Sequence, residues 1–262
     1  MTPGGPCGAT LPIMLVAAAV SPCPPLLVPE VAAGAAPELD AARAACTDAL
    51  GVLAAARPDR LVVVGPAEEG ARGPYPEGAR GSFRAFGVDL DVRLGGNGPR
   101  PRWRSAWSEP VGSADRELPA SLAVAAWLLN RTDWSDAPVE GLGLEETLET
   151  ERCVEAGAGI AARSDRVALL VMGDGSACRT LKAPGYLDER AAGFDAEVAR
   201  ALGAADVAAL KALDAGLAQE LKAAGRAPWQ VLAGAADGAG LSGALLYEDA
   251  PYGVGYLVAA WS

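Results

Sequence analysis

The side chains that can do chemistry in this chain are cysteines, carboxylates and hydroxyls, because its 262 residues include no histidine. Histidine is the one side chain whose ordinary pKa places its charge change at about pH 5 to 8. Without it, neither a Ser-His-Asp nor a Cys-His nucleophile can form. The site of two histidines and one carboxylate that holds non-haem iron is excluded, as are the usual histidine-bearing catalytic zinc sites.

Four loops that follow predicted strands are unusual enough to form a site: 22–25, 65–69, 173–179 and 247–253. In segment 21–25 (Ser-Pro-Cys-Pro-Pro) Cys23 lies between prolines, either as a positioned ligand or nucleophile or as a buried cysteine behind a rigid turn. Segment 173–176 (Gly-Asp-Gly-Ser) either cradles a phosphate or is a tight glycine turn, and it fits neither common phosphate-binding spacing. Segment 248–249 pairs two acids, which either bind a cation or are solvated.

The elements that must position these groups follow from the apolar pattern. Wholly apolar runs at 14–20, 61–64 and 167–172 predict buried strands. Between the first two, Pro37 opens a predicted helix, which ends at 57–59 and carries apolar residues at helical spacing: Leu39, Ala42, Cys46, Leu50 and Leu53. Strand, helix and strand in this order indicate a βαβ unit and therefore a parallel sheet.

Further elements complete the expected fold. Alternation of apolar and polar residues predicts a strand over 86–92, and shorter strands are expected at 139–142, 244–247 and 254–260. Helices are predicted over 118–129, 145–162, 188–202 and 207–223, with a shorter one from Pro228. The segments at 65–81 and 95–112, the latter with Trp103 and Trp107, are expected to be loops. The sequence thus predicts a single α/β domain over 13–262, in which a central, mostly parallel sheet is flanked by helices. Ligands of such sheets bind beyond the carboxyl ends of the strands.

Composition restricts partners and compartment. The formal net charge of −11 argues against nucleic acid as a partner. Five widely spaced cysteines without a C-x-x-C pair do not form a disulfide framework, so we expect reduced thiols and a cytoplasmic protein. The apolar run at 11–20 is too short to span a bilayer and lacks the basic start of a signal peptide. Residues 1–12, rich in Gly and Pro, are predicted to be a disordered extension, and abundant alanine favours helices packed through small side chains.

The order of four segments carries a family resemblance. These are 21–30 (SPCPPLLVPE), 61–67 (LVVVGPA), 173–177 (GDGSA) and 247–256 (YEDAPYGVGY). In this order they resemble the family of B-type subunits of class III extradiol ring-cleavage dioxygenases, and more narrowly its uncharacterised actinobacterial branch. The resemblance runs from about Met14 to Trp261. It implies the fold of these extradiol dioxygenase subunits, and in the family that fold holds Fe(II) so that a catecholate and O₂ bind it together.

The resemblance also implies which positions form the family's site, and there this chain departs from the pattern. Relatives place iron-binding histidines at the positions of Cys23 and Ala67 and an active-site histidine at Ala177, next to Cys178. Glu248 matches an acidic position near the C-terminus. The remaining positions of the family's site are Asp174 and Ser176. No cofactor is therefore expected, although a thiolate and a carboxylate such as those of Cys23 and Glu248 can bind Zn²⁺.

Three hypotheses about function remain open. The first is a catalytically degenerate family member, a pseudoenzyme that binds a small molecule or a partner protein. The second is an active enzyme of altered chemistry, with Cys23 or Cys178 as nucleophile or metal ligand and Asp174 or Glu248 as acid or base, as in a cysteine/carboxylate-based or metal-dependent oxidoreductase. The third is a structural component of a complex whose partner carries the iron. An oligomer is compatible with each, whereas a membrane partner is not expected.

Overall fold

The computed structural model describes residues 14–95 and 116–262. The predicted extension over 1–12 and the part of the predicted loop that carries Trp103 and Trp107 lie outside these residues. In the described part of the chain no helix is long and apolar enough to cross a membrane.

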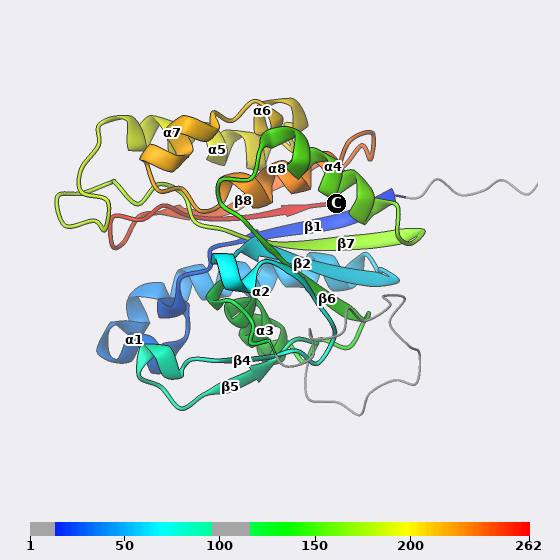
Figure 1. The fold of residues 1–262 in the computed structure, drawn as a ribbon, viewed down its shortest axis with the longest axis horizontal. Coiled ribbons are helices and arrows are strands. Elements are labelled where there is room, and N and C mark those ends of the chain that lie inside the picture. The colour runs from blue at the N-terminus through cyan, green and yellow to red at the C-terminus, as the bar shows by residue number, and fades with distance from the viewer. Residues whose placement is uncertain (1–13, 96–115) are drawn as a thin grey trace, which may run out of the picture.

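A seven-stranded sheet forms the centre of the protein (Figure 1). Its strands lie in the order β3 (Gly73–Tyr75), β6 (Val139–Leu144), β2 (Arg60–Pro66), β7 (Arg166–Met172), β1 (Met14–Ser21), β9 (Tyr256–Trp261) and β8 (Gly243–Asp249). The four strands β6, β2, β7 and β1 are mutually parallel, β9 is antiparallel to β1 and β8 to β9, and β3 is antiparallel to β6. The α/β fold with a mostly parallel sheet, predicted from the apolar runs, is confirmed.

The helices cover both faces of this sheet because the crossovers change direction. The connections from β1 to β2 and from β2 to β6 run one way along the sheet, and α2 and α3 lie on one face. The connection from β6 back to β7 runs the other way, and its helix α4 lies on the opposite face. Parallel strands joined by right-handed crossovers require this exchange of faces.

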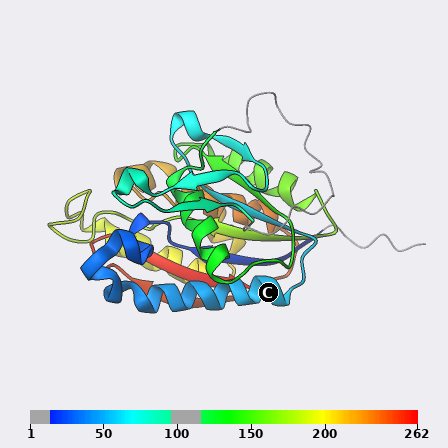
Figure 2. The same ribbon diagram turned by 90° about the horizontal axis from the view of Figure 1, so that it is seen from below.

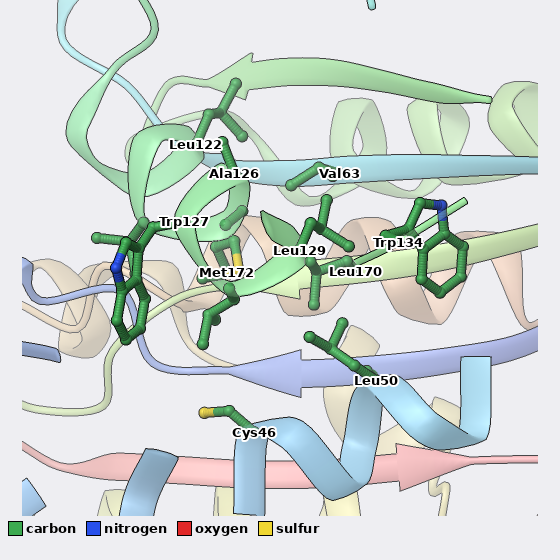
Figure 3. Packing of buried hydrophobic residues seen from close by; sticks show 14 of the residues in the cluster. Cys46, Leu50, Val63, Leu122, Ala126, Trp127, Leu129, Trp134, Leu170 and Met172 are labelled. Atoms are coloured by element: carbon green, nitrogen blue, oxygen red, sulfur yellow. The ribbon is translucent and has the colours of Figure 1, made fainter. Parts of the chain in front are cut away.

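Each face buries its own apolar cluster. On the lower face in Figure 1 lie α1 (Pro29–Ala32), α2 (Asp40–Ala55), α3 (Ala120–Arg131), the 3₁₀ turns η1 (Pro25–Leu27), η2 (Ala33–Leu39), η3 (Glu69–Ala71) and η4 (Arg84–Phe86), and a small sheet of β4 (Arg80–Ser82) and β5 (Asp91–Arg93). On the upper face lie α4 (Thr150–Ala161), α5 (Arg190–Gly203), α6 (Val207–Lys211), α7 (Ala215–Glu220) and α8 (Arg226–Ala235). Figure 3 shows α2 and α3 meeting the strands through Leu50, Leu129, Val63 and Leu170.

Glycines allow a close contact between helices α4 and α8. A Cβ at Gly157 of α4 would lie 2.0 Å from the carbonyl oxygen of Val231, and one at Gly234 of α8 would lie 2.2 Å from that of Val154. No side chain fits in that space, so α4 and α8 contact each other backbone to backbone. The expectation of helices packed through small side chains holds at this pair.

Several predicted elements differ in the structure, and segment 65–81, expected to be a loop, contains η3, β3 and the start of β4. Of the strand expected over 86–92, only Asp91 and Val92 belong to a strand, β5; Phe86 ends the 3₁₀ turn η4, and Gly87 has a φ of 82° that interrupts the extended backbone. The helix expected over 207–223 is two helices, α6 and α7. Asp214 caps the second of them by accepting a hydrogen bond from the Leu217 amide at 3.0 Å, so the chain turns where the apolar spacing alone continues.

Candidate functional site

The parallel strands bring several loops to one edge of the sheet. Ser21 at the end of β1 pairs with Met172 at the end of β7, and Pro66 at the end of β2 pairs with Leu144 at the end of β6. The four strands therefore end level with one another. The Gly173 amide then donates to the carbonyl of Ser21 at 3.0 Å, so the loops after β1 and β7 leave the sheet together.

Cys23 and Asp174 meet at this edge. The Cys23 amide donates to Asp174 Oδ1 at 2.8 Å, and the Cys23 thiol lies 3.8 Å from Oδ2. Prolines on both sides of Cys23 hold its backbone extended, and Pro24 has φ −68° and ψ 137°. The turn that carries Asp174 begins at Gly173, which lies against Gly225: a Cβ at Gly173 would lie 2.4 Å from the Gly225 Cα. The segments 21–25 and 173–176, which the sequence presents as two separate candidate sites, are thus in direct contact.

The surroundings of Cys23 and Asp174 raise the pKa of both side chains. Burial raises the pKa of the Asp174 carboxyl to about 6, although the hydrogen bonds from Cys23 oppose that rise. Burial also raises the pKa of the Cys23 thiol well above its usual range, and the charges of Asp174 and Glu146 add to the effect. At the start of β9, burial raises the pKa of the Tyr256 hydroxyl, and the charge of Asp174 raises it further.

Glu146 is a residue of this edge that the sequence patterns do not single out. It stands two residues after β6, the fourth parallel strand, and its charge raises the pKa of both Asp174 and Cys23. A signal exists in the sequence, since the run at 139–142 predicts a strand, but its end carries no unusual motif and the following segment predicts the start of a helix. The helix begins only at Thr150.

A buried arginine holds the loop that carries Glu146. The Arg226 guanidinium, at the start of α8, donates to the carbonyl oxygens of Glu146 and Leu148 and to the Gln230 side chain. These contacts satisfy backbone groups that a helix would otherwise have paired, which explains why segment 145–149 is a loop. Arg226 is therefore a positioning residue for this side of the edge.

Ser176 is held in place by hydrogen bonds to Asp195. Its amide and hydroxyl donate to the two oxygens of the buried Asp195 carboxylate at 2.7 and 2.8 Å, and Arg179 donates to the same carboxylate at 2.9 Å. A Cβ at Gly175 or Gly255 would collide with the Asp195 carboxylate. Segment 173–176 is consequently a tight turn closed around Asp195, which is the alternative to a phosphate cradle.

Cys178 belongs to the apolar cluster on the face of the sheet opposite that of Cys23, and Ala177 directly precedes it. Both are buried, and the Cys178 sulfur lies 3.5 Å from the carbonyl oxygen of Leu221 on the upper face of the sheet. Burial, followed by the charge of Asp188, raises the pKa of the Cys178 thiol. With raised pKa values, neither Cys23 nor Cys178 is a thiolate at neutral pH, which is what a nucleophile requires.

Ala67 and Glu248 contribute no partner to the pair. Ala67 follows β2 at the same edge, where its amide donates to the carbonyl of Leu144 at 2.7 Å, but its methyl group offers no ligand atom. Glu248 is exposed on β8, which is separated from β1 by β9 and lies at the margin of the described sheet.

The donor set does not fit the Fe(II) that the family resemblance implies. Across residues 14–95 and 116–262, no group of three His, Cys, Asp or Glu side chains is arranged to hold a metal ion. Of the two positions where the family resemblance implies iron-binding histidines, one is a protonated thiol hydrogen-bonded to Asp174 and the other is Ala67. An Fe(II) site needs three protein ligands facing one point.

The fold and the site together define an α/β protein with one mostly parallel sheet and a candidate site at its carboxyl edge. The crystal structure of the uncharacterized protein JW3007 from Escherichia coli K12 superposes on it with a TM-score of 0.50, over 94% of this chain and 99% of that one, at 15% sequence identity. A likeness at this identity concerns the fold alone. No family model and no curated protein matches the sequence.

Proposed function

We propose that this chain is a relative of the class III extradiol dioxygenases that has lost its iron site and binds a small phenolic molecule at the carboxyl edge of the sheet. The observation that carries the proposal is the contact between Cys23 and Asp174. It joins the loops after β1 and β7 at the position where the family resemblance implies a metal ligand. The protein would be cytoplasmic, as its cysteine usage suggests.

The groups at this edge suit a ligand that is held by hydrogen bonds. A carboxyl whose pKa is about 6 accepts hydrogen bonds at neutral pH and can donate one when protonated. Glu146 and Tyr256 stand close enough to influence its pKa or be influenced by it. These are groups that pair with the hydroxyls of a phenol or catechol without a metal.

The alternative of an enzyme with a cysteine nucleophile is less well supported. It needs a thiol pKa lowered by a neighbouring cation or a helix N-terminus. The neighbours that act on Cys23 are carboxylates, and their charges act in the opposite direction.

Metal content tests the loss of the iron site. The protein and the variant Cys23→Ala are incubated anaerobically with Fe(II) or Zn(II), desalted and analysed by mass spectrometry for metal. We expect far less than one equivalent in both proteins. One equivalent in the original chain that disappears in Cys23→Ala would contradict the proposal, because it would reveal a rebuilt cysteine-carboxylate site.

Calorimetric titration with catechol tests the ligand. We expect binding at pH 7 that weakens about tenfold in Asp174→Asn, since a hydrogen bond to a charged group contributes about 1.5–3 kcal/mol. The matched control is Asp136→Asn, an exposed acid just before β6 at the opposite edge of the sheet, which should leave binding unchanged. No heat at millimolar catechol, or an equal loss in both variants, would remove the proposed site.

A further inference from the structure

The two outer strands of the sheet differ in how well they are protected from pairing with another chain. At one margin β3 has only three residues and contains Pro74, and the Arg116 guanidinium donates to the carbonyl oxygens of Arg72 and Pro74 at 2.7 and 3.0 Å. Short length, proline and a covering charged side chain are the devices by which proteins prevent an edge strand from pairing with another chain. The β3 margin is therefore protected.

The β8 margin is neither short nor interrupted by proline, and no side chain from another element is bonded to its outer backbone groups in the described residues. Within residues 14–95 and 116–262, β8 is the last strand of the sheet, it has seven residues, and it contains neither proline nor lysine. Its middle is apolar, and Leu245 and Leu246 are 36% and 40% exposed. The ladder with β9 skips Leu246, so β8 carries a bulge at this residue, and the exposed Glu248 and Asp249 follow at the end of the strand.

Helices α2 and α5 both pack beside β8, and of the two, α2 offers little obstruction. Helix α2 runs along the same margin of the molecule as β8 and β9 (Figure 2). Its exposed positions carry small or short side chains, as the following residues show: Asp40, Ala41, Ala44, Thr47, Asp48, Gly51 and Ala55. A second polypeptide pairing with β8 would therefore not meet long charged side chains on this helix.

We propose that a second copy of this chain pairs with β8, so that two seven-stranded sheets join as a twofold symmetric dimer. Twofold pairing of antiparallel strands about Leu246 places the two Leu246 residues opposite each other. It also places Glu248 opposite Ala244 and Asp249 opposite Gly243, so no carboxylate of β8 faces another. The strand is thus complementary to itself, which is what a closed interface between identical copies requires.

The first test is the molecular mass in solution. Light scattering after gel filtration at tens of micromolar should give about twice the 26.5 kDa of the chain, and Leu246→Lys should give the monomer mass. The matched control is Leu187→Lys, which changes a similarly exposed leucine on the loop before α5 and should leave the dimer intact. A monomeric original chain, or a dimer that persists in a folded Leu246→Lys, would overturn the proposal.

The second test does not depend on disrupting the strand. Leu246→Cys is introduced together with Cys7→Ser, since the cysteines at 23, 46, 153 and 178 are buried. Mild oxidation with oxidised glutathione should link two copies through the opposed thiols, with the glutathione disulfide as electron acceptor. Leu187→Cys in the same background should stay unlinked. Absence of the Leu246→Cys dimer, or equal linking in both variants, would refute this register.

Discussion

At the scale of single residues, the candidate site is defined by what surrounds Asp174. Its carboxyl accepts a hydrogen bond from the Cys23 amide and lies beside the Cys23 thiol, which stays protonated. The charge of Glu146 also acts on it. No cation is among the groups that set its pKa, and burial is the largest cause of its shift. The site is therefore a weak acid in a partly buried position, which differs from the usual surroundings of a metal-binding carboxylate.

This shift predicts how stability depends on pH. Because the pKa of Asp174 is about 6 in the folded protein and its ordinary value is 3.8, the folded protein binds the proton more tightly than the unfolded chain. The contribution of this group to stability is fully present below pH 3.8 and is lost as pH rises through 6. Asp174→Asn removes that dependence and keeps an oxygen acceptor for the Cys23 amide.

Urea unfolding of the original chain and of Asp174→Asn at pH 4.5 and pH 7 measures the effect. The variant should gain about 1–2 kcal/mol relative to the original chain between the two pH values, after allowance for partial solvent screening. Asp136→Asn, which changes an exposed carboxylate, should show no such gain. A relative loss in Asp174→Asn at pH 7 would mean that the carboxylate is stabilised in the folded state.

At the scale of elements, the upper layer depends on glycines at positions where no larger residue fits. Gly157 and Gly234 permit α4 and α8 to approach until the backbone of one contacts the backbone of the other. Gly159 is in the same helix as Gly157, yet a Cβ there would meet nothing within 4 Å. Two alanine substitutions in one helix should therefore have opposite effects.

Gly157→Ala should destabilise the protein by about 3 kcal/mol or more, because an added methyl group must push the two helices apart. Gly159→Ala should stabilise it by about 0.5–1 kcal/mol, since alanine has the higher helix propensity. Denaturant unfolding monitored by circular dichroism compares the two. Similar stabilities of the two variants would show that α4 and α8 do not pack as closely as described.

At the scale of the whole molecule, the net charge of −11 acts against compactness. Acidic side chains outnumber basic ones 33 to 22, and like charges spread over one small protein repel one another. Salt screens this repulsion beyond about 10 Å at 0.1 M. The effect should vanish near the isoelectric point of about 4.6.

Thermal unfolding at two ionic strengths tests this balance. At pH 8 the midpoint should rise by about 2–4 °C between 10 and 300 mM NaCl, which corresponds to about 1 kcal/mol for a protein of this size. At pH 5 the same change in salt should have little effect. A midpoint that falls with salt at pH 8 would indicate that ion pairs such as Arg179–Asp195 outweigh the general repulsion.

The parallel core and the absence of imidazole chemistry can both be predicted from the amino-acid sequence alone. Strands such as Leu61–Val64 are buried on both faces, so their apolar runs are continuous and need no tertiary information to be read. Element ends were less predictable, because Gly87 and Asp214 act through local backbone geometry that periodicity does not contain.

Which of the candidate residues form a site depends on the tertiary structure. Cys23 and Asp174 are 151 residues apart and meet because β1 and β7 are neighbours in the sheet. Cys178 is four residues from Asp174 but lies on the upper face, since the turn around Asp195 directs its side chain into the core. Strand order and side-chain direction arise from long-range packing, and spacing along the chain does not encode them.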